Sequence, residues 1–292
     1  MKRAPFVRKG SQAYYERMRI DAHQHFWDLS RLTYPWMPSE PSPLRKTYLP
    51  STLQPILETH RFEGSVVVQA HHSLDETLWL LELARDNDFI KGVVAWVDLT
   101  DPLLGRTLDE LQPDRHFKGV RHLVHDEPDP QWLLRPDVLR GLGELARRDI
   151  PYDLLLRPLH LPLVPVLADK LPSLRMVIDH IAKPSISSGE FDRWARLMEA
   201  VFPLTGVYCK LSGMITEAPW NNWSASDLRP YVAFVMQGFG PARLMFGSDW
   251  PVCLLAGTWK EVFAACTQAM GPQPVDLREQ VLGATAIQFY RL

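Results

Sequence analysis

Residues 19–27 read RIDAHQHFW, a short apolar run that carries two histidines in H-x-H spacing. Side chains alternate between the two faces of a β-strand, so His23 and His25 would point to the same side. If that side lines a pocket, the two imidazoles converge and can hold a metal ion or transfer a proton. The H-x-H pattern is common on its own, so its meaning depends on the segments that follow it.

Seven further β-rich segments follow, each bounded by turn residues, and several are apolar on both faces, which is typical of buried parallel strands. With the first, the predicted strands are 19–26, 64–70, 91–99, 117–124, 151–157, 175–181, 206–212 and 243–249. Between them lie stretches with helical periodicity, among them 77–87, 137–149 and 161–171. Eight such units in about 270 residues predict an α/β fold, a (β/α)8 TIM barrel. A doubly wound open sheet is disfavoured because no G-x-G-x-x-G or P-loop motif follows any strand.

The composition fits one globular domain. The chain has 292 residues, of which 46% are hydrophobic and 23% charged, and its formal net charge is −2. We expect residues 19–292 to form a single catalytic barrel, because no linker-like stretch interrupts them, and residues 1–18 to form an N-terminal extension. The charges are scattered rather than gathered into the basic stripe of a nucleic-acid-binding protein.

The cysteines and the N-terminal residues indicate the cellular compartment in which the protein is expected. The three cysteines show no C-x-x-C spacing, which favours free thiols in a reducing environment. The basic N-terminus lacks the apolar core of a secretory signal, and no apolar run approaches the ~20 residues of a membrane span. We therefore expect a cytoplasmic protein without nucleic-acid or membrane partners, and the sequence leaves a homodimer open.

In a TIM barrel, catalytic groups lie at the C-terminal ends of the strands. Polar residues end five of the predicted strands: His23 and His25, Arg121 and His122, Asp179 and His180, Lys210, and Asp249. Unpaired charges are rare inside protein cores, so five polar strand ends at one rim indicate a shared site. We expect this site to combine the histidines of the first and sixth strands with Asp249.

Several motifs together carry a family resemblance. DAHQHFW near the start, DHIAKP on the sixth strand, GSDWP on the eighth and the final FYRL resemble the amidohydrolase superfamily. More narrowly, with YPW at 34–36 and the pattern GVRH…DEPD within 119–129, they resemble its amidohydrolase-2 branch, which contains sugar lactonases of the L-fuconolactonase and L-rhamnonolactonase type. The resemblance runs from about residue 19 to the C-terminus and implies a distorted (β/α)8 barrel.

The resemblance implies roles for the rim residues. His23, His25 and Asp249 would bind a divalent metal, most commonly zinc, and Asp249 would also handle the proton of the attacking water, with His180 beside it. A binuclear centre is not expected, because the fourth strand ends without a bridging lysine or glutamate and the fifth lacks a histidine, His160 coming only in the following loop. Related branches include lactonases that work without metal, so the need for one stays open.

Lactone hydrolysis requires an activated water, stabilisation of the carbonyl oxygen and a proton for the leaving alkoxide. We expect Asp249 to act as general base and then as general acid, with the three histidines positioning the water or a metal. Without a metal, Arg121, His122 and Lys210 are expected to hydrogen-bond the developing oxyanion. Aromatic residues of two rim loops suit stacking on a sugar ring, or packing of the loops onto the barrel: Trp27, Trp36 and Trp220.

The sequence thus predicts a hydrolase that opens a sugar-derived lactone, such as L-fucono- or L-rhamnono-lactone, to the sugar acid. An alternative on the same scaffold is a decarboxylase or an aromatic-lactone hydrolase. Such substrates carry carboxylates and would call for several rim arginines, whereas only Arg121 and Arg157 qualify here. A third alternative is a non-catalytic barrel that binds sugar or metal, which a general base at Asp249 argues against.

Overall fold

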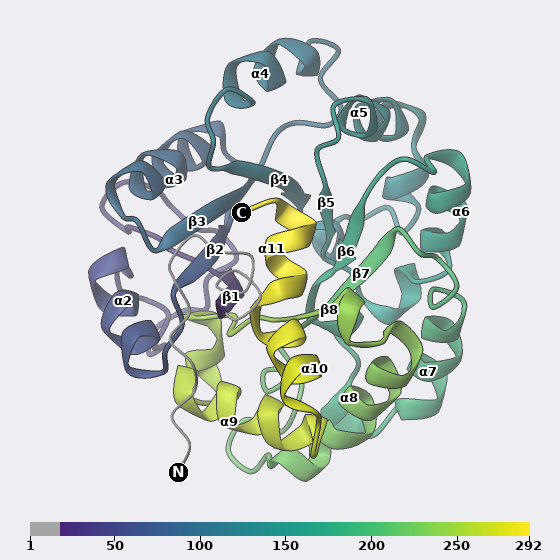
Figure 1. Ribbon diagram of the computed structural model, residues 1–292. Helices are drawn as coiled ribbons and strands as arrows, with labels where there is room; N and C mark the ends of the chain where they lie inside the picture. Colours follow the sequence, from purple (N-terminus) through teal and green to yellow (C-terminus); the bar gives the residue numbers. More distant parts are fainter. Residues whose placement is uncertain (1–17) are drawn as a thin grey trace.

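The eight β-rich segments form the predicted barrel. The computed structural model describes residues 18–292, and its parallel strands pair in chain order within one sheet (Figure 1). The strands are β1 (Ile20–Gln24), β2 (Gly64–Val68), β3 (Ile90–Ala95), β4 (Phe117–His122), β5 (Tyr152–Leu154), β6 (Met176–Ile178), β7 (Val207–Leu211) and β8 (Leu244–Phe246). Just beyond β8, the Asp249 N–H donates to the His23 carbonyl at 2.8 Å, which joins the last strand to the first. This closure confirms a (β/α)8 barrel.

Some strands end earlier than predicted. β5, β6 and β8 have three residues each, so His180 and Asp249 lie beyond the strands on which the sequence placed them. Both residues have positive φ, 55° and 57°, and this conformation ends extended strand pairing. Register shifts between β1 and β2, β2 and β3, and β3 and β4 further distort the barrel.

Most of the helices surround the sheet in Figure 1 and cover its outer face, while the last one lies across the barrel. The helices are α2 (Pro50–Thr59), α3 (Leu74–Asp86), α4 (Leu104–Leu111), α5 (Pro136–Arg147), α6 (Leu163–Lys170), α7 (Phe191–Glu199), α8 (Ala225–Phe239), α9 (Trp259–Met270), α10 (Val275–Glu279) and α11 (Thr285–Tyr290). The helices predicted at 77–87, 137–149 and 161–171 correspond to α3, α5 and α6. α3 begins earlier than its apolar periodicity because the Ser73 hydroxyl caps it, accepting from the Glu76 N–H.

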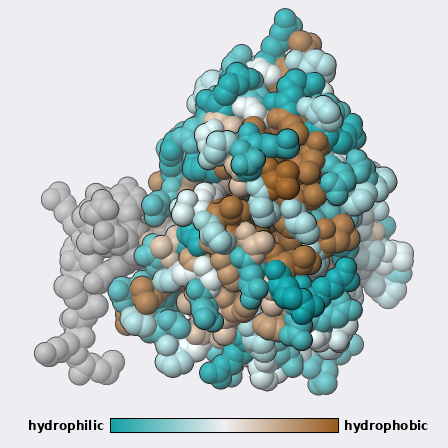
Figure 2. Space-filling model, turned by 90° about the vertical axis from the view of Figure 1, so that its right-hand side faces the viewer, coloured by the Kyte–Doolittle hydropathy of each residue, from teal (hydrophilic) through white to brown (hydrophobic). Residues whose placement is uncertain are grey.

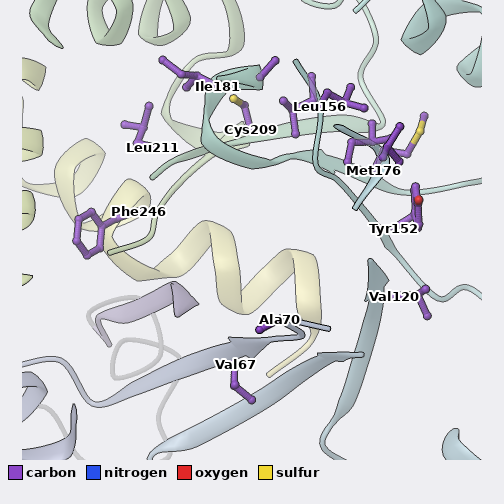
Figure 3. Close-up of a cluster of buried hydrophobic side chains, with 14 of the residues drawn as sticks. Val67, Ala70, Val120, Tyr152, Leu156, Met176, Ile181, Cys209, Leu211 and Phe246 are labelled. Carbon is purple, nitrogen blue, oxygen red and sulfur yellow. The ribbon is translucent and has the colours of Figure 1, made fainter. Parts of the chain in front are cut away.

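The apolar core has two layers, as period-two alternation along the strands requires. Val67 and other outward-facing strand residues pack against the helices, and part of this layer is drawn in Figure 3. Val66 and Val68 face into the barrel, where they meet Ala286 and Phe289 of α11. α11 lies across the centre of the barrel in Figure 1 and closes its N-terminal end. The open, C-terminal end is left for the polar residues.

The outer surface is mixed in character. Figure 2 shows the face formed by the helices on the right of Figure 1, which is largely polar with an apolar area near its middle. Leu159 and Val166, before and on α6, are among the exposed apolar side chains of the chain. None of the helices within residues 18–292 is long and apolar enough to cross a membrane. The predicted N-terminal extension lies outside the described residues except for Met18, which is buried.

Gly141→Ala in α5 is expected to destabilise the fold by about 1–3 kcal/mol, the usual cost of overpacking a tight contact. A Cβ at this position would lie 2.2 Å from the Leu99 carbonyl oxygen, which is backbone and cannot turn away. Urea unfolding followed by circular dichroism measures the change. The matched control is Gly143→Ala in the same helix, where the nearest contact of the new Cβ would be an ordinary 3.8 Å to Leu171. The control should gain up to about 1 kcal/mol from helix propensity, and equal losses in both variants would contradict the packing argument.

Candidate active site

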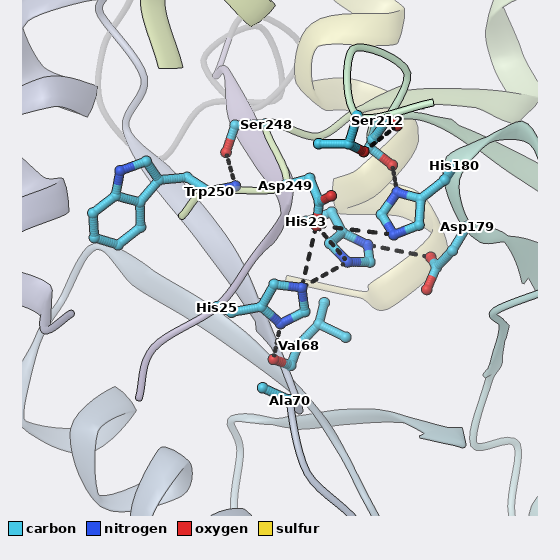
Figure 4. Close-up of polar contacts among 12 residues, drawn as sticks. His23, His25, Val68, Ala70, Asp179, His180, Ser212, Ser248, Asp249 and Trp250 are labelled. Atoms are coloured by element: carbon cyan, nitrogen blue, oxygen red, sulfur yellow. Dashed lines mark hydrogen bonds and ion pairs between the residues drawn. The ribbon is translucent and has the colours of Figure 1, made fainter. Parts of the chain in front are cut away.

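Four of the predicted site residues meet at the C-terminal mouth of the barrel (Figure 4). One oxygen of Asp249, Oδ1, lies 3.3 Å from His25 Nε2, 3.7 Å from His23 Nε2 and 3.9 Å from His180 Nε2. All four side chains are buried. A carboxylate oxygen therefore sits among three imidazoles, in a position to exchange a proton with a molecule bound beside them.

The backbone around Asp249 explains how it reaches this place. Asp249 adopts a left-handed conformation that aspartate tolerates better than most residues. Two residues earlier, Gly247 lets β8 approach β1 closely, since a Cβ there would lie 2.5 Å from the His23 Cβ. The His25 N–H donates to the Trp250 carbonyl at 2.7 Å. The first and eighth strands are thus locked together where their functional side chains emerge.

The hydrogen bonds of His23 and His25 fix where their protons lie. His25 Nδ1 is 2.7 Å from the Val68 carbonyl, which can only accept, so Nδ1 carries the proton. His23 Nδ1 is 3.2 Å from both an Asp179 oxygen and Lys210 Nζ. Its Nε2 lies 3.3 Å from Arg121 NH1, which can only donate, so Nε2 holds the lone pair and Nδ1 the proton. Burial lowers the pKa of both imidazoles, that of His23 well below 6.5. Both rings are therefore neutral at neutral pH and present the lone pair of Nε2.

The two Nε2 atoms are 3.2 Å apart, so their lone pairs would repel unless a donor or a cation lies nearby. Arg121 supplies a donor at 3.3 Å from His23 Nε2. A metal would fit as well, because His23, His25 and Asp249 offer ligand atoms that all lie within 4.8 Å of one another. Two neutral imidazoles and a carboxylate suit zinc, and the Val68 carbonyl and Asp179 orient the rings as outer partners do in zinc sites.

The His180 imidazole is positioned by a residue that follows β7. Its Nδ1 lies 2.8 Å from the Ser212 hydroxyl, just beyond β7. Next to Ser212, Gly213 has a φ of 59° and allows the chain to pass the imidazole, since a Cβ there would lie 2.5 Å from His180 Nδ1. Burial lowers the pKa of His180 well below 6.5, so this third imidazole is neutral too. Its Nε2 is left to face Asp249.

Asp249 itself is a carboxylate. Burial would raise its pKa, but interactions with the His180 and His25 imidazoles and with Lys183 outweigh that effect and leave the pKa below its ordinary 3.8. A carboxylate with a low pKa is charged throughout the physiological pH range, and its oxygen can accept a proton from bound water.

Beneath the histidines lies a buried group of opposite charges, defined by Arg121, Asp153, Asp179 and Lys210. Lys210 Nζ is 2.5 Å from Asp153 and 3.0 Å from Asp179, and Arg121 NH1 is 3.1 Å from Asp179. From α11, the Tyr290 hydroxyl donates to the Asp153 carboxylate at 2.8 Å. Each charge in this group is paired, as the low dielectric of a barrel interior requires. The group links the floor of the barrel to His23.

A cavity of about 250 Å³ opens above this group. Its lining combines the mouth residues with side chains of the loops: His25, Trp36, Ala70, Arg121, Leu123, His125, Asp126, Leu155, His180, Lys183, Asp249 and Val252. Of the predicted substrate-binding residues, Arg121 and Trp36 therefore lie where substrate contact was expected. Trp36 is fixed by a 2.6 Å hydrogen bond from its indole N–H to the Ala70 carbonyl.

The structure places the other four predicted substrate-binding residues outside the cavity lining. Lys210 is fully buried below the cavity, where its charge is paired with Asp153 and Asp179. His122 follows Arg121 on β4 and so faces the opposite way. It stacks between His72 and Trp132, at 4.0 Å from each ring, and contacts Glu127.

The two remaining aromatic residues belong to loop packing. Trp27 is fully buried, and its indole N–H points to the carbonyls of Leu44 and Lys46. Trp220 is 47% exposed and donates to the Thr216 carbonyl of its own loop. Neither residue lines the cavity as the structure describes it. Both positions match the packing alternative that the sequence had left open.

Sequence reasoning missed three polar residues of the cavity wall: His125, Asp126 and Lys183. Two of them lie inside motifs that carry the family resemblance, Asp126 in DEPD and Lys183 in DHIAKP. That signal could have nominated them. Their direction depends on tight turns after β4 and β6, which residue spacing does not predict.

Comparisons with known proteins place the chain among hydrolases. The amidohydrolase family model matches residues 20–292. An L-fucono-1,5-lactonase from Burkholderia ambifaria is 36% identical over 281 residues, covering 94% of this chain and 96% of that protein. Another, from Burkholderia multivorans, is 37% identical with the same coverage.

A crystal structure of an amidohydrolase from Burkholderia multivorans with bound zinc has the same fold. It superposes with a TM-score of 0.87 at 37% identity, covering 94% of this chain and 99% of that one. The family match spans the whole barrel, including β1 and the segments just after β1, β6 and β8, where the four mouth residues lie. The chain belongs to the amidohydrolase family.

Proposed function

We propose that this protein hydrolyses an aldono-lactone of the L-fucono-1,5-lactone type to the sugar acid. The observation that carries the proposal is the Asp249 carboxylate among three neutral imidazoles, facing a cavity with a polar wall. The lactonase relatives support the substrate class. Within residues 18–292, Arg121 is the one arginine that lines the cavity, and Asp179 pairs with it. This charge balance suits a neutral polyol better than a dicarboxylate.

In the proposed mechanism, Asp249 Oδ1 takes a proton from water as the water oxygen attacks the lactone carbonyl carbon. The imidazoles of His25 and His180, each with Nε2 near Asp249, hold the water in line. When the tetrahedral intermediate collapses, the bond to the ring oxygen breaks. Asp249 then returns its proton to the departing ring oxygen, and the sugar acid is formed.

We propose zinc as the metal that His23, His25 and Asp249 would hold. Bound there, it would lower the pKa of a ligated water toward ~7. Support comes from the donor set and from the zinc-containing relative. Arg121, which lies 3.3 Å from His23 Nε2, gives the same imidazole a partner when no metal is bound.

The function is tested by acid release from a panel of lactones, followed with a pH indicator. We expect turnover of L-fucono-1,5-lactone and related neutral aldono-lactones. Lactones that carry a free carboxylate besides the lactone ester should be hydrolysed more slowly. The same assay is run on protein treated with a chelator and then supplied with zinc. Turnover that survives chelation assigns water activation to Asp249 alone, and turnover that zinc restores assigns His23 and His25 as ligands. Acid release from none of the lactones would refute the proposed function.

A further inference from the structure

The chain after β6 makes a turn of the opposite hand to ordinary helical turns. His180, Ile181, Ala182 and Lys183 all have positive φ, between 47° and 61°. The Lys183 N–H donates to the His180 carbonyl at 2.8 Å, so the turn is the mirror image of a 3₁₀ turn. L-residues other than glycine pay roughly 1–2 kcal/mol each for this conformation, and none of the four is glycine. Such strain persists where surrounding contacts enforce it.

The hand and pitch of this turn determine which side chains reach the cavity. With three residues per turn, side chains three apart stand on the same side. His180 and Lys183 are three apart, and both line the cavity. Ile181 and Ala182, between them, are fully buried in the core that packs against the helices. The two core residues thus anchor the turn, while its two polar residues face the cavity that Asp249 also lines.

The Lys183 ammonium is held in place by the next loop. Its Nζ lies 2.6 Å from Glu217 Oε1, and the two side chains are only 16% and 17% exposed. The Glu217 carbonyl accepts from the Ser187 N–H at 2.9 Å, which ties this loop back to the segment after the turn. Lys183 lines the cavity together with His125, and burial, with the charge of Lys183, lowers the pKa of His125 to about 3.

The two cations of the cavity differ in how far they lie from solvent: the Arg121 side chain is 3% exposed and its Nε has no hydrogen-bond partner within residues 18–292, whereas the Lys183 side chain is 16% exposed. Arg121 already contacts Asp179, His23 and the Gln69 carbonyl. Among the described residues, the structure gives the Lys183 ammonium one partner, Glu217. An ammonium has three N–H donors, so two remain for a bound molecule. A fixed cation with free donors at the cavity wall is the arrangement that stabilises negative charge developing on a substrate oxygen.

We propose that Lys183 is a catalytic residue that donates a hydrogen bond to the lactone carbonyl oxygen as it becomes an oxyanion. This inference rests on the proposed function. As the water oxygen bonds to the carbonyl carbon, the π electron pair moves onto the carbonyl oxygen beside Lys183, and the water proton goes to Asp249. When the pair returns, the bond to the ring oxygen breaks and that oxygen takes the proton from Asp249. Lys183 stays protonated throughout.

The test is Lys183→Met, with Lys183→Arg and the double variant Lys183→Met/Glu217→Gln, each assayed on the lactone that the wild-type protein turns over best. We expect Lys183→Met to lower kcat by about 10²–10³-fold, the usual cost of one oxyanion donor, with KM changed by less than about threefold. Lys183→Arg should recover part of kcat because it keeps the charge. The double variant should stay as slow as Lys183→Met. Lys260→Met, an exposed lysine of α9, is the matched control and should retain the wild-type rate.

The outcomes distinguish a wrong role for Lys183 from a wrong proposed function. If the wild-type protein releases acid and Lys183→Met is equally fast, the inference is wrong while the proposed function stands. A rise in KM with unchanged kcat would also overturn it, since the lysine would then bind only the ground state. Recovery of kcat in the double variant would overturn it too, because the loss would stem from the stranded Glu217 carboxylate. A wild-type protein inactive on every lactone would instead refute the proposed function.

Discussion

Asp249→Asn is expected to lower kcat for lactone hydrolysis by about 10²–10⁴-fold, the contribution of a general acid–base catalyst. The amide keeps the size of the side chain and can still hydrogen-bond His25, but it cannot take a proton from water. Initial rates of acid release at saturating lactone measure the effect. Asp192→Asn, the same change on the exposed surface of α7, is the control for general effects of the substitution.

The pH profile gives a second check on Asp249. Its pKa is held below the ordinary 3.8, so the carboxylate form is present above that range and is lost only as the pH falls through the lowered pKa. For the wild-type protein, kcat should therefore show no acid limb from a carboxylate across neutral and weakly acidic pH. A variant that kept more than about a tenth of the wild-type kcat, or an acid limb near neutrality, would speak against Asp249 as the base.

Lys210→Met should destabilise the protein by about 3–5 kcal/mol, the cost of breaking a buried ion pair. The lysine is fully buried, and its loss leaves Asp153 without its 2.5 Å partner and Asp179 with one cation fewer. Methionine fills a similar volume, so the change reports on charge more than on packing. Urea unfolding of the purified variant, monitored by tryptophan fluorescence, gives the difference in free energy of unfolding.

A compensating variant tests the same explanation. Lys210→Met/Asp153→Asn removes one charge of each sign, and we expect it to regain a substantial part of the lost stability. Asp153→Asn alone should be destabilised, since Lys210 then lacks its shortest contact. A double variant no more stable than Lys210→Met would mean that the lysine acts through packing against its neighbours.

The sequence predicted the barrel well because strand and helix periodicities differ and repeat eight times. It also predicted the convergence of His23, His25, His180 and Asp249, since parallel strands present their C-terminal ends at one rim. It could not predict the depth of Lys210, because a strand pattern shows which face a residue takes and not how far it lies below the rim. For His122, the alternation that places Arg121 inward should have placed its neighbour outward.

The other positions that the sequence did not predict lie in loops. Trp27 and Trp220 belong to long rim segments. Trp27 is held by a hydrogen bond to the Lys46 carbonyl, 19 residues along the chain, and Trp220 by one to the Thr216 carbonyl of its own loop. Lys183 reaches the cavity through a turn that local propensity disfavours, so its position follows from tertiary packing around Ile181. Residue spacing does not predict such conformations.

The closure of β8 onto β1 bears on how the protein folds. His23 and Asp249 are 226 positions apart (249 − 23), yet the hydrogen bond from Asp249 N–H to the His23 carbonyl is part of the closure itself. Contacts so distant along the chain are slow to form, because a long loop must be closed first. A chain whose first and last strands have not met has no assembled catalytic centre, however much of its helix content is in place. Enzymatic activity is therefore a reporter of barrel closure.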